Sequence, residues 1–88
     1  MQYRYIVQFE NGRYYHQKGY HVCDYDEVEY ECESTVLDEG ELKRLVETIW
    51  MPLSTTRIHI ALKNVELLIG TIRLDDYVNE TGVYYQYD

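Results

Sequence analysis

One segment of this chain, residues 37–51, carries a helical pattern, and the other patterned segments read as β-strands. Asp38 is suited to cap the helix, and Glu41 stands three residues later, where it completes a capping box. The apolar residues then recur at helical spacing and form one stripe: Leu42, Leu45, Val46, Ile49 and Trp50. Pro52 predicts that the helix ends at residue 51. A helix with one apolar face must pack on another layer, so the strands around it decide the fold.

The strands before the helix begin with a hairpin. Residues 3–10 alternate apolar or aromatic side chains with mostly polar ones, and Asn11-Gly12 follows, which is a strong signal for a two-residue type I′ turn. The register that this turn sets pairs Glu10 with Arg13, Phe9 with Tyr14 and Val7 with His16. The returning strand covers residues 13–18. Residues 20–26 are either continued strand or a turn that leads into an acidic strand at residues 28–32.

Three further strands are expected after the helix. Residues 57–63 alternate, and residues 83–87 predict a short strand at an edge. Residues 65–74 are apolar on both faces, with Gly70 inside, and predict a central strand or two strands with a bulge. Asp75-Asp76 separates the last two. The expected fold is a single α+β domain over residues 1–88, in the order β-β-β-α-β-β-β. It has an antiparallel or mixed sheet of about five to six strands, with one amphipathic helix packed on one face.

The acidic residues are concentrated in one part of the chain. No lysine or arginine stands between Lys18 and Lys43, and nine of the sixteen carboxylates fall in that gap. If residues 28–32 form a strand, side chains alternate, and four carboxylates point to one face: Glu27, Glu29, Glu31 and Glu33. They would then stand at intervals of roughly 6.6–6.8 Å, twice the rise per strand residue. That spacing is comparable to the separation of phosphates along a nucleic-acid strand.

The charge balance predicts the class of partner. With a net charge of −8, the chain is not expected to bind nucleic acid or an anionic membrane directly, because both are polyanions. A basic protein surface is the expected partner, and aromatic side chains among the acids would anchor the contact. The expected contact residues are Asp24, Tyr25, Asp26, Glu27, Glu29, Tyr30, Glu31 and Glu33. The alternative is that the acids form a solvated face, or an edge strand that charge protects from aggregation.

Other chemistry is weakly supported by the sequence. His21, Cys23 and Cys32 could ligate a metal, but zinc sites usually pair ligands at both ends, so two reduced, half-buried cysteines are the simpler interpretation. A calcium loop lacks its glycine, and neither a nucleophile elbow nor a phosphate-binding loop is found. Acids crowded along a solvated strand also lack the burial that raises a catalytic pKa. We therefore expect no catalysis, no cofactor and no metal.

These features lead to one main hypothesis and one alternative. In length, acidity and tyrosine content the chain is similar to small inhibitors of phages and mobile elements, including anti-CRISPR proteins and DNA mimics. The resemblance is one of size and composition and transfers no residue roles. The main hypothesis, which rests on the acidic segment and the charge, is a non-enzymatic cytoplasmic inhibitor that occupies the basic nucleic-acid-binding site of a partner protein. The alternative is a small homodimeric interaction protein, paired through residues 84–87 or through the Tyr3 and Tyr5 strand, whose acids only maintain solubility.

Overall fold

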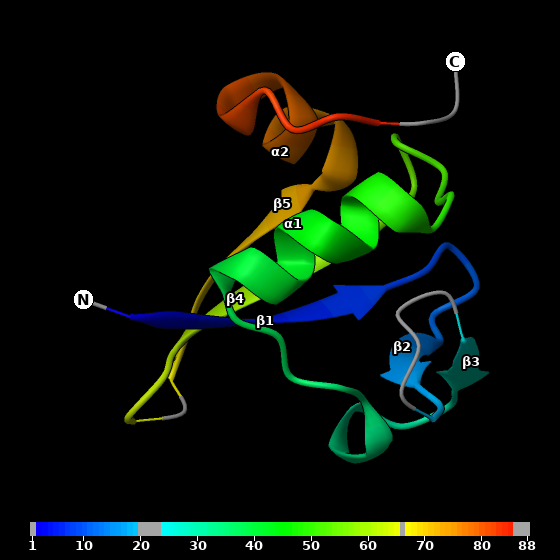
Figure 1. The fold of residues 1–88 in the computed structure, drawn as a ribbon. Helices are drawn as coiled ribbons and strands as arrows, with labels where there is room; N and C mark the ends of the chain where they lie inside the picture. Colours follow the sequence, from blue (N-terminus) through cyan, green and yellow to red (C-terminus); the bar gives the residue numbers. More distant parts are fainter. Residues whose placement is uncertain (1, 20–23, 66, 86–88) are drawn as a thin grey trace.

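The computed structural model describes residues 2–19, 24–65 and 67–85. The elements follow in the order β1 (Tyr3–Gln8), β2 (Tyr14–Gln17), β3 (Tyr25–Val28), a 3-10 helix η1 (Glu31–Glu33), α1 (Glu39–Thr48), β4 (Arg57–Leu62), β5 (Leu68–Arg73) and α2 (Leu74–Thr81). The five strands form one antiparallel sheet in the order β3-β2-β1-β4-β5 (Figure 1). The α+β class is confirmed. The predicted element order and the single helix are wrong, because a second helix follows β5.

The first hairpin has a different turn from the predicted one. The N–H of Gly12 donates to Phe9 O at 2.9 Å, and the N–H of Phe9 donates to Arg13 O at 2.8 Å. Gly12 has a φ of 85°, the left-handed conformation that closes a three-residue loop. Gln8 therefore pairs with Tyr14, and the predicted register is wrong by one residue. Such a shift exchanges the two faces of a strand, so Tyr15 rather than Tyr14 enters the core, where it is 1% exposed.

The start of α1 is as predicted. The side chain of Asp38 accepts a hydrogen bond from the Glu41 N–H at 2.7 Å, and the Glu41 side chain accepts one from the Asp38 N–H at 3.0 Å. The helix ends at Thr48, earlier than predicted, because Ile49 is extended with φ −117° and ψ 126°. Alternate residues of an extended segment point the same way, so Ile49 and Met51 are both buried. Trp50 lies between them and is 45% exposed, so it does not belong to the apolar stripe.

We expect the substitution Asp38→Ala to lower the free energy of unfolding by about 1 kcal/mol, within a range of roughly 0.5–2 kcal/mol. It removes the oxygen that accepts from the Glu41 N–H, which is one of the otherwise unpaired donors of the first helical turn. Urea denaturation followed by circular dichroism would measure the change. Asp38→Asn is the matched control, because it keeps an acceptor oxygen and should cost less. Equal losses in the two variants would contradict the role of the cap.

The second helix, α2, occupies the position where the sequence predicted only an interruption between strands. Asp75 and Asp76 lie in its first turn, where negative charge interacts favourably with the helix dipole, and both form ion pairs with Arg73, whose Nε lies 3.3 Å from Asp75 Oδ1 and 3.6 Å from Asp76 Oδ2. Gly82 ends the helix with a φ of 67°. The apolar residues that face the core recur at helical spacing: Leu74, Tyr77 and Val78. The helix therefore had a pattern that the sequence analysis missed.

The predicted terminal strand at residues 83–87 is not formed over its described part, residues 83–85. Residues 86 and 87 lie outside the described residues. Val83 is buried at 6% exposure, and the Tyr85 hydroxyl donates a hydrogen bond to Met51 O. The segment after α2 is therefore used to cover the core rather than to extend the sheet.

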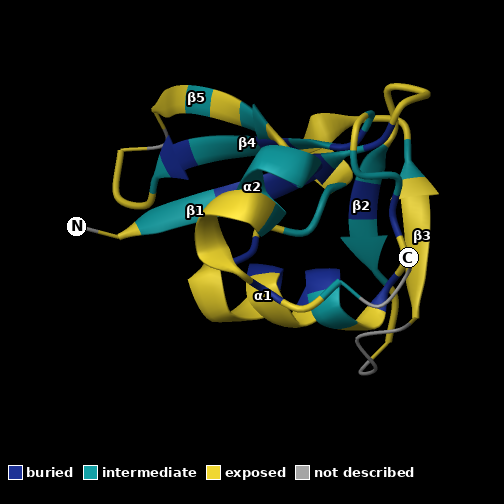
Figure 2. Cartoon of the chain, turned by 90° about the horizontal axis from the view of Figure 1, so that it is seen from above, coloured by how far each residue is buried: buried dark blue, intermediate teal, exposed yellow. Residues whose placement is uncertain are grey.

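The core lies between one face of the sheet and the two helices. Val7, Ile58 and Ile72 stand in one row across β1, β4 and β5, and their side chains share the face that packs on the helices. Figure 2 shows the buried parts of α1 turned toward the strands and its exposed parts turned away. The largest fully buried side chains are Tyr15, Leu42, Leu45, Met51, Ile58 and Leu74.

Residues 68–73 form an edge strand and not the predicted central one. β5 pairs with β4 on one side only, so the predicted two-sided burial is wrong, and Leu68 and Ile69 are 59% and 49% exposed. A bulge sets Ile69 outside the paired positions, because Ile60 pairs with Gly70 and Ala61 with Leu68. The apolar side chains on both faces predicted burial, but the strand order places this segment at the edge of the sheet.

Candidate functional site

The acidic segment, residues 24–33, does not form the predicted strand. β3 ends at Val28, a bend follows at residues 29 and 30, and η1 covers Glu31–Glu33. The partner strand explains the end point: β2 begins at Tyr14, which pairs with Val28, so no strand residue remains to pair beyond it. Ser34 then closes a tight turn, because its N–H and its hydroxyl both donate to Glu31 O, at 3.0 and 2.6 Å. The predicted row of Glu27, Glu29, Glu31 and Glu33 on one strand face is therefore wrong.

The acidic segment is nevertheless attached at both ends. On its amino-terminal side, Asp24 O accepts from the Lys18 N–H at 3.0 Å, and β3 pairs with β2 along its whole length. After η1, Thr35 bonds to β2 twice: its N–H donates to Tyr15 O at 3.0 Å, and its hydroxyl accepts from the Gln17 N–H at 2.7 Å. Two backbone hydrogen bonds, at 2.8 and 2.9 Å, then join Leu37 to Tyr5 of β1. The segment is therefore a fixed part of the fold.

The predicted contact residues divide between the two faces of the sheet. Tyr25 and Glu27 point to one face and Asp26 to the other, as strand alternation requires. Tyr25 packs against Phe9 and Tyr15, with ring centroids 6.2 and 5.8 Å apart. All eight predicted residues are exposed, and Tyr30 is 58% exposed. They are Asp24, Tyr25, Asp26, Glu27, Glu29, Tyr30, Glu31 and Glu33.

Few neighbouring groups compensate these carboxylates. Lys18 Nζ lies 3.4 Å from Asp26 Oδ2, in a pair so exposed that it stabilises the fold little. The amide of Asn11 donates to Glu27 Oε2 at 2.9 Å and holds that carboxylate in place. Within residues 2–19, 24–65 and 67–85, no ion pair involves the remaining four acids: Asp24, Glu29, Glu31 and Glu33. The segment therefore presents a strong negative potential to solvent.

His59 of β4 lies on the helix-free face of the sheet. Its ring contacts Gln8 Oε1 at 2.7 Å and Thr71 Oγ1 at 2.9 Å. Because an amide oxygen only accepts, Nε2 carries the proton, and Nδ1 accepts from the Thr71 hydroxyl. Burial lowers the pKa of His59 from its ordinary 6.5, while the charge of Glu31 opposes that shift.

A pocket that the sequence analysis did not foresee lies beside Glu27. It has a volume of about 310 Å³, and its walls are aromatic and acidic: Phe9, Glu10, Asn11, Tyr25, Glu27, Trp50 and Pro52. Trp50 reaches it because α1 ends at Thr48 and the next residues are extended. An aromatic wall beside carboxylates suits a cationic side chain, which the ring faces and the charges both attract.

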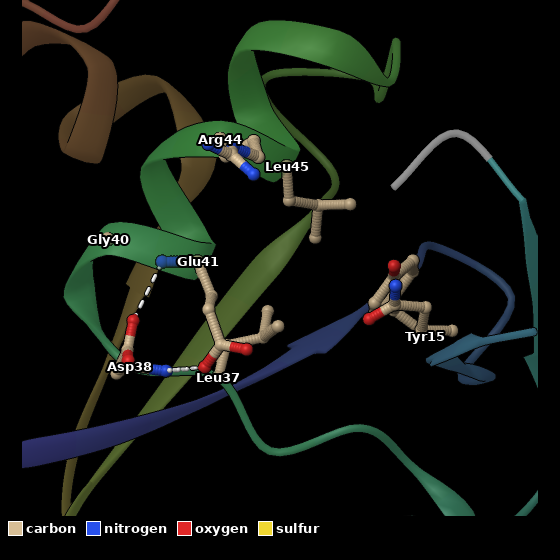
Figure 3. Close-up of a pocket in the computed structure, with 8 residues that line it drawn as sticks. Tyr15, Leu37, Asp38, Gly40, Glu41, Arg44 and Leu45 are labelled. Atoms are coloured by element: carbon tan, nitrogen blue, oxygen red, sulfur yellow. Dashed lines mark hydrogen bonds between the residues drawn. The ribbon is translucent and has the colours of Figure 1, made fainter. Parts of the chain in front are cut away.

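A larger pocket of about 490 Å³ lies between β2 and α1 (Figure 3). Figure 3 shows the capping box of Asp38 and Glu41 at one end and Tyr15 across the opening. Burial raises the pKa of Tyr15, and the charge of Glu41 raises it further. The two carboxylates of this pocket, Asp38 and Glu41, form the capping-box hydrogen bonds at the start of α1. Its described lining supplies no serine, cysteine or histidine that could act as a nucleophile or base.

The predicted metal candidates are only partly described. His21 and Cys23 lie outside the described residues, and Cys32 is an exposed free cysteine in η1. Of the residues that the structure describes, no three His, Cys, Asp or Glu side chains gather as a metal site requires. No helix in the described part of the chain is long and apolar enough to cross a bilayer.

Comparison with known proteins gave no match: no protein-family model, no curated protein and no solved structure is similar to this chain.

Proposed function

We propose that this protein is a non-enzymatic acidic binding protein that covers the basic nucleic-acid-binding surface of a partner protein. The observation that supports this function is the acidic segment itself. Six carboxylates lie within ten residues, all are exposed, and the backbone that carries them is attached to β1 and β2. Binding would place these carboxylates against arginine and lysine side chains that otherwise hold phosphates.

The geometry changes how the resemblance to nucleic acid is understood. Because β3 ends at Val28, the carboxylates do not repeat at a phosphate-like interval, and Asp26 and Glu27 point to opposite faces of the sheet. The proposed competition with nucleic acid therefore depends on charge density, not on regular spacing. Charge density also gives fast association that weakens as salt is added. This mode of action fits an inhibitor of the phage or mobile-element type, working in the cytoplasm where such partners act.

The aromatic pocket beside Glu27 supplies a place for one basic side chain of the partner. Tyr25 and Trp50, which are 37% and 45% exposed, line this pocket together with Glu10 and Glu27. A guanidinium group there would gain cation–π and charge-assisted contacts at once. Aromatic anchors of this kind give an interface the short-range affinity that exposed charges alone do not.

We expect the triple variant Glu29→Gln, Glu31→Gln and Glu33→Gln to release far less protein from immobilised DNA than the native chain does. In this experiment, proteins of the source cells are bound to DNA-cellulose, the acidic protein is added at low salt, and released proteins are identified by mass spectrometry. The three side chains are exposed and no ion pair of the described residues uses them, so the fold should persist. At high salt the native chain should also release less.

The matched control is the double variant Asn79→Lys and Glu80→Lys. Both positions are exposed near the carboxyl end of α2, where cations favour the helix, and the net charge changes by the same three units. The control should release the same proteins as the native chain. If the control releases as little protein as the triple variant, net charge alone is responsible. If both variants release as much protein as the native chain, the acidic segment is not the contact surface.

A further inference from the structure

The second unusual surface of this protein is apolar and lies at the other edge of the sheet. Four exposed large apolar side chains stand close together in sequence, at the β4–β5 turn and the start of β5. Their exposed fractions are 63% for Val65, 57% for Leu67, 59% for Leu68 and 49% for Ile69. Single exposed apolar residues are ordinary on protein surfaces, but a contiguous group marks an interaction site. Figure 2 shows β5 along the outside of the sheet.

The backbone of β5 adds a second reason to expect a contact. β5 is the last strand in the order β3-β2-β1-β4-β5, so no strand of the described residues lies beside one row of its N–H and C=O groups. Natural edge strands are usually protected by charged side chains. The opposite edge, β3, follows this rule with Asp26 and Glu27, whereas β5 has one charged residue, Arg73 at its carboxyl end, and none at residues 68–72. The bulge at Ile69 interrupts the ladder but leaves the apolar side chains outside.

We infer that the β5 edge pairs with the β5 edge of a second copy of this chain, antiparallel across a two-fold axis. A two-fold axis places the same apolar group on both sides of the contact, which makes the surface complementary to itself. The two sheets then join into one sheet of ten strands. This inference goes beyond the proposed function, because it adds a self-association surface that partner binding does not require.

The distribution of charge favours a second copy over a basic protein as the occupant of this edge. Two chains with a net charge of −8 repel each other unless their contact is remote from the acidic segments. Along the sheet, β3 lies four strand spacings from β5, about 19 Å, so the two acidic segments of the dimer lie about 43 Å apart. That separation is several times the screening length of about 8 Å at physiological salt. A basic protein, by contrast, would be drawn to the β3 edge.

Sedimentation equilibrium tests the inference directly. The native chain should show a mass that rises with concentration toward twice 10.6 kDa. The double variant Leu68→Lys and Ile69→Lys places four cations across the two-fold axis and should weaken dimerisation at least thirtyfold or so, as expected for two central contact residues. The control variant Val36→Lys and Tyr84→Lys adds the same charge at positions that are 45% and 67% exposed elsewhere. It should dimerise as the native chain does.

A second measurement needs no variant. Hydrogen exchange of the native chain should show β5 amides that become protected as the concentration rises, while amides of β3 do not change. A mass of 10.6 kDa at millimolar concentration overturns the inference, as does a dimer that the double variant Leu68→Lys and Ile69→Lys leaves intact. If the native chain is monomeric and that double variant no longer releases proteins from DNA-cellulose, the edge instead contacts the partner protein. None of these outcomes contradicts the proposed role of the acidic segment.

Discussion

The substitution Tyr15→Ala is expected to lower the free energy of unfolding by about 3–5 kcal/mol, as large-to-small substitutions of buried aromatic residues do. Tyr15 is 1% exposed and is the largest of the fully buried side chains. Its side chain packs the hairpin of β2 and β3 against the core. This contact matters because Gln8 and Tyr14 form the one pair between the described strands β1 and β2. Domains of this size are stable by about 5–15 kcal/mol, so the loss would be a large fraction of the total. Urea denaturation followed by circular dichroism would measure it.

Tyr14→Ala is the informative control for this prediction. Tyr14 is the adjacent residue and the same type, but it points to the helix-free face and is only half-buried. Its loss should cost about 1 kcal/mol, the usual value for a substitution that opens no core cavity. A larger cost at Tyr14 than at Tyr15 would support the register predicted from Asn11-Gly12 and contradict the observed one.

The second large effect is expected in alkali. Burial, the charge of Glu39 and a hydrogen bond of 3.2 Å to that carboxylate together raise the pKa of Tyr5 from 10.0 to about 12. Burial also raises the pKa values of Tyr15 and Tyr77. A raised phenol pKa means that the folded state holds the proton more tightly than the unfolded chain. Its stabilising effect is complete below pH 10 and is lost as the pH rises toward about 12, so the domain should unfold in that window.

Urea denaturation at a series of pH values from 8 to about 12 tests this expectation. In the variant Tyr5→Phe, stability should fall less steeply above pH 10, because one group no longer ionises on unfolding. Removing the hydrogen bond to Glu39 should also cost about 1 kcal/mol at neutral pH, so the slopes are compared rather than the absolute stabilities. Tyr84→Phe is the control, since Tyr84 is 67% exposed. Equal slopes in all three proteins would contradict the assignment to Tyr5.

Features that depend on neighbours in sequence were predicted well. The capping box needs only Asp38 and Glu41 three residues apart, and the stripe of Leu42, Leu45 and Val46 needs only helical spacing. Strand β4 was also predicted within one residue of its observed end. The helix α2 had comparable signals in Leu74, two first-turn acids and Gly82. It was missed because Asp75-Asp76 was interpreted as an interruption and not as the first turn of a helix.

Features that depend on distant partners were predicted poorly. Whether Asn11-Gly12 closes a two-residue or a three-residue loop was decided by which of Tyr14 and Tyr15 packs better against the core, and Tyr15 occupies that place. The length of β3 was decided by where β2 begins. The exposure of Leu68 and Ile69 was decided by the strand order, which leaves β5 with one neighbour. Each of these three features depends on residues in another segment of the chain.

The candidate site divides in the same way. Its composition, with Asp24, Asp26 and the glutamates that follow, could be read from the chain. The pocket of Phe9, Tyr25 and Trp50 could not, because it joins a turn, a strand and the end of a helix.

The amino-acid sequence by itself determined the charge, the class of fold and the start of α1, because each depends on residue type or on spacing within a few residues. Only the tertiary structure decided the hairpin register, the end of β3 and the apolar edge at β5, whereas α2 had local signals that were misinterpreted. The physical reason is that strand pairing and burial are settled between segments far apart in the chain, where a side chain's environment depends on which partner packs against it.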